Sequence, residues 1–137
     1  MRTMKTSPIK PITPANMHKL ALELIDLLHE KDLYGDTIIY VGTKLKIQKD
    51  LTNDVLVNPK QRPVTTPHGL VVYETEFDGK IPTEYNNPKT LTVTFEDDLY
   101  IVMNQFGKLH DELNNLFSKY SLYLEMGHAW DFSIYPV

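Results

Sequence analysis

An acidic pair with a histidine between its members lies near the carboxyl-terminal end of the sequence. Glu125 and Asp131 fall on the polar sides of two alternating runs of residues, and His128 lies in the loop between the runs. If the runs form a hairpin, the two carboxylates lie opposite each other beside the imidazole. Two carboxylates and an imidazole suit Mn²⁺ or Zn²⁺. The trio therefore predicts a divalent metal site, or a small metal- or ligand-binding protein or hydrolase built around it.

The register of this hairpin decides whether the carboxylates face each other. With the three-residue loop 127–129, apolar residues match in three pairs, which are Met126 with Trp130, Leu124 with Phe132 and Leu122 with Ile134. A two-residue loop would instead set Leu124 against Asp131, so we expect the longer loop. Like charges directly opposite each other are unfavourable, and a lysine or a metal ion would relieve them. The alternative is that both acids splay into water and bind nothing.

Common catalytic patterns are missing from the sequence. There is no cysteine for a thiolate nucleophile or a Cys-based metal site, no glycine-rich phosphate loop, no G-x-S-x-G turn and no H-E-x-x-H pair. The remaining histidines, which are His18, His29, His68 and His110, do not form a metal-ligand pattern. The sequence therefore predicts no catalytic residue and favours a non-enzymatic protein.

Aromatic, apolar and basic residues on the sides expected to face solvent are the candidate binding residues. They are Ile39, Val41, Lys44, Lys46, Tyr123 and Tyr135. The first four share one side of the first hairpin in its expected register, and an exposed apolar patch of this kind marks an interaction site. The two tyrosines fall on the polar sides of the last two strands, and tyrosine is enriched at protein interfaces. The pattern predicts contact with another protein, with a second copy of this chain as an alternative.

The balance of charge argues against a domain built to bind nucleic acid. Lys and Arg number 14 against 18 Asp and Glu, for a net charge of −4 at pH 7, whereas nucleic-acid affinity comes from Lys and Arg that neutralise phosphates. Binding through Lys44 and Lys46 remains a minor alternative, because Tyr40 is expected in the core and few aromatic residues interleave with the lysines. No apolar run approaches the length of a membrane span, and no secretory signal is visible. We therefore expect a cytoplasmic protein without membrane contact.

The strongest local signal is a helix near the start of the chain. Thr13 is a suitable N-cap and Pro14 a suitable first helical residue, and apolar residues follow at spacings of three and four. The pattern predicts a helix over 14–32, with Gly35 as its carboxyl-terminal cap. The polar, proline-spaced residues 1–12 are expected to form a flexible tail.

A hairpin is expected directly after this helix. Two short apolar runs, 37–41 and 44–48, flank Gly42-Thr43, and a glycine in the first position of a two-residue loop is typical of a type II′ turn. This loop length places four residues together on the side that faces the core, namely Ile38, Tyr40, Leu45 and Ile47. Ile39 and Val41 then lie on the opposite, partly solvated side.

The middle of the chain combines long loops with two clear strands. Residues 49–67 contain several X-Pro and Asn-Asp steps that favour irregular structure, with a short edge strand expected at 55–57. Alternating residues predict strands over 70–77 and 90–96, joined by a proline-rich loop over 82–88.

The last third of the chain adds helices and the final hairpin. Residues 99–106 are ambiguous between strand and helix, and we favour a helix, while 108–119 has helical spacing. The two segments form either two helices or one helix bent at Gly107. Consecutive strands with short connections favour an antiparallel sheet. We therefore predict a single α+β domain over 13–137, with an antiparallel sheet of five to six strands and two or three helices on one face.

One resemblance adds a biological setting. The segment Tyr120-Ser121-Leu122-Tyr123-Leu124-Glu125-Met126-Gly127-His128-Ala129-Trp130-Asp131, with the early helix and Ile39-Tyr40, resembles uncharacterised small proteins of phages and integrated elements of Gram-positive bacteria. The resemblance implies no fold, activity or cofactor. It does imply a small accessory protein that binds and modulates a host or defence protein.

Overall fold

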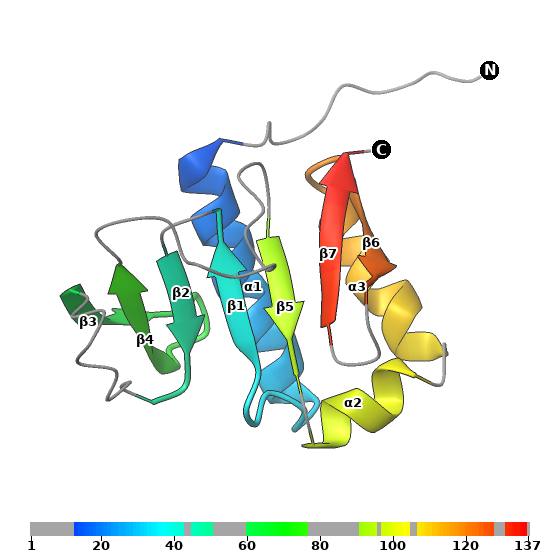
Figure 1. The fold of residues 1–137 in the computed structure, drawn as a ribbon, viewed down its shortest axis with the longest axis horizontal. Helices are drawn as coiled ribbons and strands as arrows, with labels where there is room; N and C mark the ends of the chain where they lie inside the picture. The colour runs from blue at the N-terminus through cyan, green and yellow to red at the C-terminus, as the bar shows by residue number, and fades with distance from the viewer. Residues whose placement is uncertain are drawn as a thin grey trace.

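Seven strands form one antiparallel sheet in the computed structural model, and three helices pack against it (Figure 1). The structure describes residues 13–42, 45–50, 60–76, 91–95, 97–104, 107–127 and 131–136, which carry all of these elements. The tail predicted over 1–12 and the loop predicted over 82–88 lie outside them. The expected α+β fold with an antiparallel sheet is confirmed, and the sheet has more strands than the five to six predicted.

In chain order the elements are α1 (Pro14–Glu30), β1 (Ile38–Val41), β2 (Leu45–Gln48), β3 (Lys60–Thr65), β4 (Val71–Glu76), β5 (Leu91–Thr94), α2 (Asp97–Met103), α3 (Lys108–Ser118), β6 (Leu122–Met126) and β7 (Asp131–Pro136). The strands lie side by side in the order β3-β4-β2-β1-β5-β7-β6, and each neighbouring pair is antiparallel. β1 is therefore the central strand, and β3 and β6 are the two edges.

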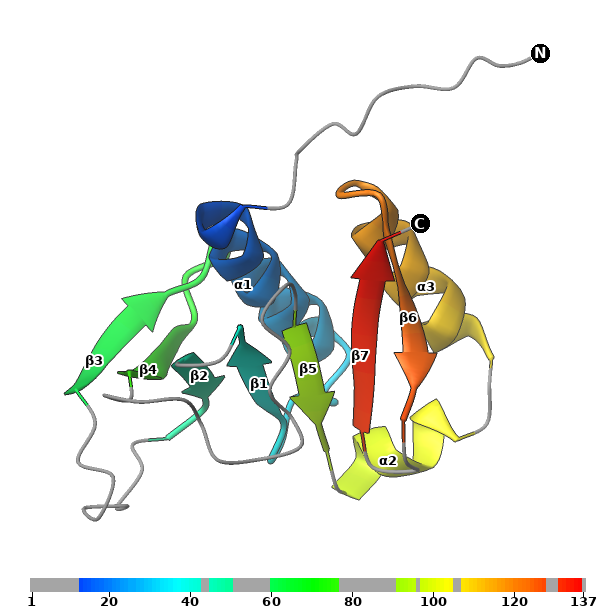
Figure 2. The ribbon, with the colours of Figure 1, turned by 45° about the horizontal axis from the view of Figure 1, so that its top comes forward.

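Two helices cover one side of the sheet. Figure 1 shows α1 passing behind β1 and β5 and α3 passing behind β6 and β7, while α2 lies at the end of the sheet where β5 ends. Figure 2 shows α1 and α3 on the same side of the sheet, and the two helices contact each other. We call this side the helix-covered face. The opposite side, which no helix of the described residues covers, is the helix-free face.

α1 begins as predicted and ends slightly earlier. The Thr13 side-chain oxygen accepts a hydrogen bond of 3.1 Å from the backbone N–H three residues further on, which confirms the N-cap. The prediction that Gly35 caps the other end is wrong, because Asp32 takes the left-handed conformation with φ 58°. That turn lets the Leu33 N–H donate to the Leu28 carbonyl at 2.8 Å, the main bond of a Schellman ending.

The register of the β1–β2 hairpin differs by one residue from the prediction. The Cα partners are Ile39 with Ile47, Tyr40 with Lys46 and Val41 with Leu45. Ile39 and Val41 are buried, with 0% and 8% of their surface exposed. Ile38 and Tyr40, which were expected in the core, are half-buried and lie on the helix-free face. The prediction failed because both sides of the hairpin carry apolar residues, so Gly42 alone decided the expected loop length.

β3 occupies part of the segment that was predicted to be an irregular loop over 49–67. It pairs with β4 over six positions, and the short strand expected at 55–57 lies outside the described residues. Proline is tolerated in an edge strand where its missing N–H would point away from the neighbouring strand. In an antiparallel pair, the N–H groups of every second residue point toward the neighbouring strand. The Thr66 N–H points toward the β4 side, since it donates to the Leu70 carbonyl at 2.8 Å. Pro63, three residues earlier, is therefore at a position that points away from β4.

The other elements lie close to their predicted bounds. β4 and β5 fall inside the strands expected over 70–77 and 90–96. α2 confirms the helical interpretation over 99–103, whereas residues 105–106 of that predicted segment lie outside the described residues. α2 and α3 are separate helices rather than one bent helix, since Gly107 is the N-cap residue of α3.

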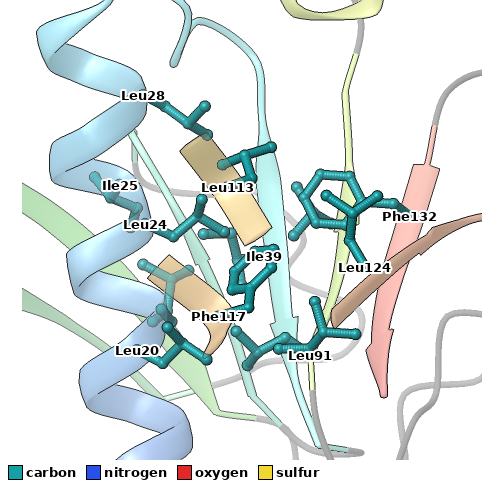
Figure 3. Packing of buried hydrophobic residues seen from close by; sticks show 14 of the residues in the cluster. Leu20, Leu24, Ile25, Leu28, Ile39, Leu91, Leu113, Phe117, Leu124 and Phe132 are labelled. Atoms are coloured by element: carbon teal, nitrogen blue, oxygen red, sulfur yellow. The ribbon is translucent and has the colours of Figure 1, made fainter. Parts of the chain in front are cut away.

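The hydrophobic core lies between the helix-covered face and the two helices (Figure 3). Leu20, Leu24 and Leu28 of α1 point toward the sheet, where Ile39 of β1 lies beneath them. Phe132 of β7 contacts two other aromatic rings of the core, with centroid distances of 5.9 Å to Phe95 and 6.1 Å to Phe117. Each fully buried Leu, Ile or Phe side chain contributes roughly 1.5–3 kcal/mol to the stability of such a core.

Two tyrosines are almost fully buried but differ in their hydrogen bonding. Tyr34 and Tyr120 are 3% and 2% exposed. The Tyr120 hydroxyl donates to Glu23 Oε1 at 2.8 Å, whereas the Tyr34 hydroxyl finds no hydrogen-bond partner within the described part of the chain. Burial raises the pKa of both hydroxyls above that of an ordinary tyrosine, and Glu23 and Asp50 add to the rise for Tyr120 and Tyr34 respectively.

This difference predicts unequal effects of removing each hydroxyl. At pH 7, Tyr120→Phe should lower the free energy of unfolding by about 1 kcal/mol because a hydrogen bond is lost, and Tyr34→Phe should leave it unchanged or raise it.

The raised pKa values of the two hydroxyls also predict a pH dependence of stability. The stabilisation of the folded state that comes from these raised pKa values is complete below about pH 10 and is lost above it, because the unfolded chain then ionises while the folded chain does not. The variant that carries both Tyr34→Phe and Tyr120→Phe should therefore lose less stability than the wild type when the pH is raised from about 9 to about 11. Urea unfolding followed by circular dichroism measures both effects, and a larger loss for Tyr34→Phe than for Tyr120→Phe would contradict them.

Candidate functional site

The predicted metal trio is not assembled as expected. Glu125 pairs with Ser133, because the β6–β7 hairpin is paired two residues further along β7 than predicted. Asp131 pairs instead with Thr94 of β5 and is buried, whereas Glu125 is exposed. The prediction that the two carboxylates face each other is therefore wrong, and His128 lies outside the described residues. The part of the chain that the structure describes contains no group of three His, Asp or Glu side chains that could hold a metal ion.

Asp131 has a structural position at the start of β7. Its backbone carbonyl accepts a hydrogen bond of 3.1 Å from the Gly127 N–H. A Cβ atom at residue 127 would lie 2.5 Å from Asp131 Oδ1, so a larger residue there would require the Asp131 side chain to move. The lack of a side chain at Gly127 therefore leaves room for the carboxylate of Asp131.

The first hairpin does not expose the predicted apolar patch. Ile39 and Val41 are buried on the helix-covered face, so the expectation that they face solvent is wrong. The same one-residue shift moves Tyr40 out of the core to pair with Lys46 on the helix-free face. Lys44 lies outside the described residues.

Tyr123 and Tyr135 form a cross-strand pair on the helix-free face. They are Cα partners in the β6–β7 ladder, with ring centroids 6.2 Å apart and an angle of 44° between the rings. Their exposed fractions are 36% and 39%. The Tyr123 hydroxyl donates to Glu125 Oε2 at 3.0 Å, and this hydrogen bond is the main cause that raises the pKa of Tyr123. The pair thus presents two partly exposed rings with a carboxylate fixed beside them.

Four strands each place a tyrosine on the helix-free face. Cross-strand partners share a face, and the ladder links Tyr40 through Thr92 to Ser133, which lies two residues from Tyr135. On the other side of β1, the ladder links Tyr40 through β2 to the face of β4 that carries Tyr73. The sequence did not predict that these tyrosines share a face, because the expected register of β1 placed Tyr40 in the core.

Neither edge of the sheet suits the addition of a partner strand. In β3, Pro63 occupies an outward position where a backbone N–H would otherwise be available. In β6, the outward N–H of Leu124 donates to the Asn114 side-chain oxygen at 3.0 Å, so α3 already occupies it. Both features are typical of edge strands protected from pairing with other chains.

Two buried carboxylates, which sequence reasoning missed, tie α1 to the β3–β4 hairpin. Glu74, only 2% exposed, pairs with His18 Nε2 of α1 and with Arg62 Nη2 of β3. Asp26 of α1, 4% exposed, accepts hydrogen bonds from the Thr66 hydroxyl at 2.5 Å and the His68 N–H at 3.0 Å. Asp26 lies outside the apolar stripe of the predicted helix, so the helical pattern gave no signal that this carboxylate is buried.

Comparison of the chain with protein-family models, with curated proteins and with solved structures finds no match. No helix within the described residues has the length and apolar character needed to cross a membrane. The function must therefore be argued from the sheet and its surface residues.

The buried carboxylate of Asp26 should matter more for stability than the exposed one of Glu30, although both contact His68. Glu30 Oε2 lies 2.5 Å from His68 Nδ1, with 53% of the glutamate side chain exposed. Asp26→Ala should lower the free energy of unfolding by about 2–3 kcal/mol, because two hydrogen bonds to a buried charged group are lost. Glu30→Ala, the matched control, should cost less than about 1 kcal/mol.

Urea unfolding gives these values, and amide hydrogen exchange locates the effect. The His68 amide should exchange faster in Asp26→Ala and remain protected in Glu30→Ala, because Asp26 accepts its hydrogen bond. Equal losses of stability in the two variants, or an unchanged exchange rate, would show that Asp26 does not hold the hairpin.

Proposed function

We propose that this protein is a non-enzymatic binding module that docks on another protein through its helix-free face, with Tyr123 and Tyr135 at the centre of the contact. The observation that carries the proposal is the exposed cross-strand pair of these tyrosines on a face that no described helix covers. Tyrosine supplies a large contact area at a small cost in side-chain entropy and is enriched among residues that dominate binding energy.

Docking by the face of the sheet is favoured over docking by its edges. Pro63 and the Leu124–Asn114 hydrogen bond interrupt the backbone groups along β3 and β6. A partner that added a strand would lose a hydrogen bond at each of these places. A partner that packs on the tyrosine rings needs no free backbone groups.

The charge beside the tyrosines favours a partner segment that contains arginine or lysine. Glu125 is exposed and is held by the Tyr123 hydroxyl, and the whole chain has a net charge of −4. Arginine can stack on a tyrosine ring and pair with a carboxylate at the same time. A phosphate backbone would instead meet the carboxylate, which disfavours nucleic acid. Consistent with its resemblance to phage and integrated-element proteins, we propose a host or defence protein as the partner.

The tyrosine pair should decide which partner the protein retains. We propose affinity purification from the native host with the tagged wild type, the Tyr123→Ala/Tyr135→Ala variant, and Tyr100→Ala as the control. Tyr100 is 42% exposed but lies on α2, away from the pair. The partner should be retained by the wild type and the control and lost by the double variant. With the purified partner, the double variant should raise Kd at least tenfold, as expected when two central tyrosines are truncated.

Three results would overturn the proposal. The first is equal retention of every captured protein by the wild type and the double variant. The second is binding to single-stranded nucleic acid that falls steeply with salt, which would indicate a phosphate-binding surface. The third is a homodimer in light scattering that the double variant dissociates, because a second copy of the chain would then occupy the face.

A further inference from the structure

The residues that precede α1 carry the same chemistry that the tyrosine pair is proposed to bind. Residues 1–12 contain three basic residues and no acidic one, namely Arg2, Lys5 and Lys10. They lie outside the described residues, which begin with Thr13, the N-cap of α1. The domain to which they are attached displays the exposed carboxylate of Glu125 beside two partly exposed tyrosine rings. Complementary charges are therefore present on two parts of one chain.

The tyrosine pair lies at the end of the sheet where α1 begins. Tyr123 is the second residue of β6, and Tyr135 is the last but one of β7. Figure 1 and Figure 2 both show the start of α1 at the same end of the sheet as the end of β7. The chain therefore enters α1 at the end of the molecule that carries the pair.

The number of residues before α1 is sufficient for the path to the pair. β6 lies three strands from β1, behind which α1 passes, so the path across the sheet is roughly 14 Å, and the step between packed layers adds roughly 10 Å. Extended chain covers roughly 3.3 Å per residue, and the prolines before Thr13 favour extended backbone. Lys5 and Arg2, eight and eleven residues before Thr13, therefore reach the pair. Lys10, three residues before Thr13, does not.

We propose that residues 1–12 fold back over this end of the sheet and place Arg2 and Lys5 against the tyrosine pair, where they compete with the partner. A guanidinium group stacks on a tyrosine ring and pairs with a carboxylate in the same contact. Glu125 is held beside Tyr123 by a hydrogen bond of 3.0 Å, so this carboxylate is in place for the contact. The inference rests on the proposed function, since it names the regulation of that same surface.

Attachment to the domain makes a weak contact sufficient. A segment on a short linker has an effective concentration on the order of millimolar at a site on its own chain. A contact with a dissociation constant of about 1 mM therefore covers the tyrosine pair about half of the time, which raises the apparent Kd of a competing ligand about twofold. The segment thus acts as an autoinhibitory ligand that a partner must displace.

A spin label on the segment tests the contact directly. The chain contains no cysteine, so Ser7→Cys provides a single position for a nitroxide label two residues from Lys5. In two-dimensional amide NMR of the isotope-labelled full chain, the label should broaden the amides of β6 and β7. The Tyr123→Ala/Tyr135→Ala variant should lose at least half of this broadening. The control Tyr100→Ala, on α2 at the other end of the sheet, should keep it.

Charge variants and a peptide measure the competition without any partner. The probe is a synthetic peptide of residues 1–12, added to the full-length protein. Arg2→Glu and Lys5→Glu in the protein should each release the attached segment, so the peptide should bind each variant about twofold more tightly than the wild type. Lys10→Glu is the matched control, because it makes the same change of charge at a residue that does not reach the pair. It should leave the Kd of the peptide unchanged.

Any of three results contradicts the inference. One is broadening of β6 and β7 that is absent, or that is the same in the Tyr123→Ala/Tyr135→Ala variant. Another is equal affinity of the peptide for the wild type, Arg2→Glu and Lys5→Glu. The third is equal broadening in a mixture of spin-labelled protein with isotope-labelled protein that has no spin label, because the segment would then contact a second copy.

The outcome is distinguishable from that of the proposed function. A partner that is retained only with the intact tyrosine pair, together with no broadening from the label, supports the proposed function and overturns this inference alone. Broadening that depends on the pair, together with equal retention of every captured protein by the wild type and the Tyr123→Ala/Tyr135→Ala variant, supports the contact of the segment and overturns the proposed function.

Discussion

The apolar stripe of α1 requires one continuous apolar face on the sheet. The alternation of side chains along β1, which puts Ile39 and Val41 on the side of the helices, supplies the centre of that face. Ile39 lies beneath α1 and is paired with Val93 of β5, which is paired in turn with Phe132 of β7. Because the strands are hydrogen-bonded neighbours, this row fixes which side of every other strand is covered. The tyrosines lie on the helix-free face as a consequence, since each occupies the opposite parity in its own strand. The surface available to a partner is therefore set by the packing of a single helix.

Hydrophobic periodicity predicts most elements of this fold but not every register. The helix behind Thr13 and the strand around Val93 follow from clean patterns, because each has one apolar side. β1 carries isoleucine on both sides, so the sequence of the strand alone does not show which side faces the helices. Matching apolar residues across the hairpin would have paired Ile39 with Ile47, as observed, but the glycine turn signal favoured a shorter loop. β3 was missed because proline normally argues against a strand, and only the sheet order reveals that it lies at an edge.

The last hairpin explains why the face on which Tyr123 and Tyr135 lie was easier to predict than the metal trio. Its register differs from the prediction by two residues, and an even shift leaves every side chain on its expected face. Tyr123 and Tyr135 therefore remain on the polar side, where the sequence placed them. A metal site depends on which residues are directly opposite, and the shift replaces Asp131 by Ser133 across from Glu125. Candidate sites that need only a shared face tolerate such errors, whereas sites that need direct neighbours do not.

Polar groups inside the molecule divide into those that hold the fold and those that it leaves unpaired. The β3–β4 hairpin is joined to α1 by Asp26 and Glu74, whose oxygens are paired across the elements. Thr37 and Gln48 lie at strand ends, where their side-chain oxygens join no other element of the described chain. Since an unpaired buried oxygen is unfavourable to folding, the fold itself gives no reason for them. Asp26 and Glu74 therefore hold α1 against the hairpin, whereas the unpaired oxygens of Thr37 and Gln48 contribute no such contact between elements.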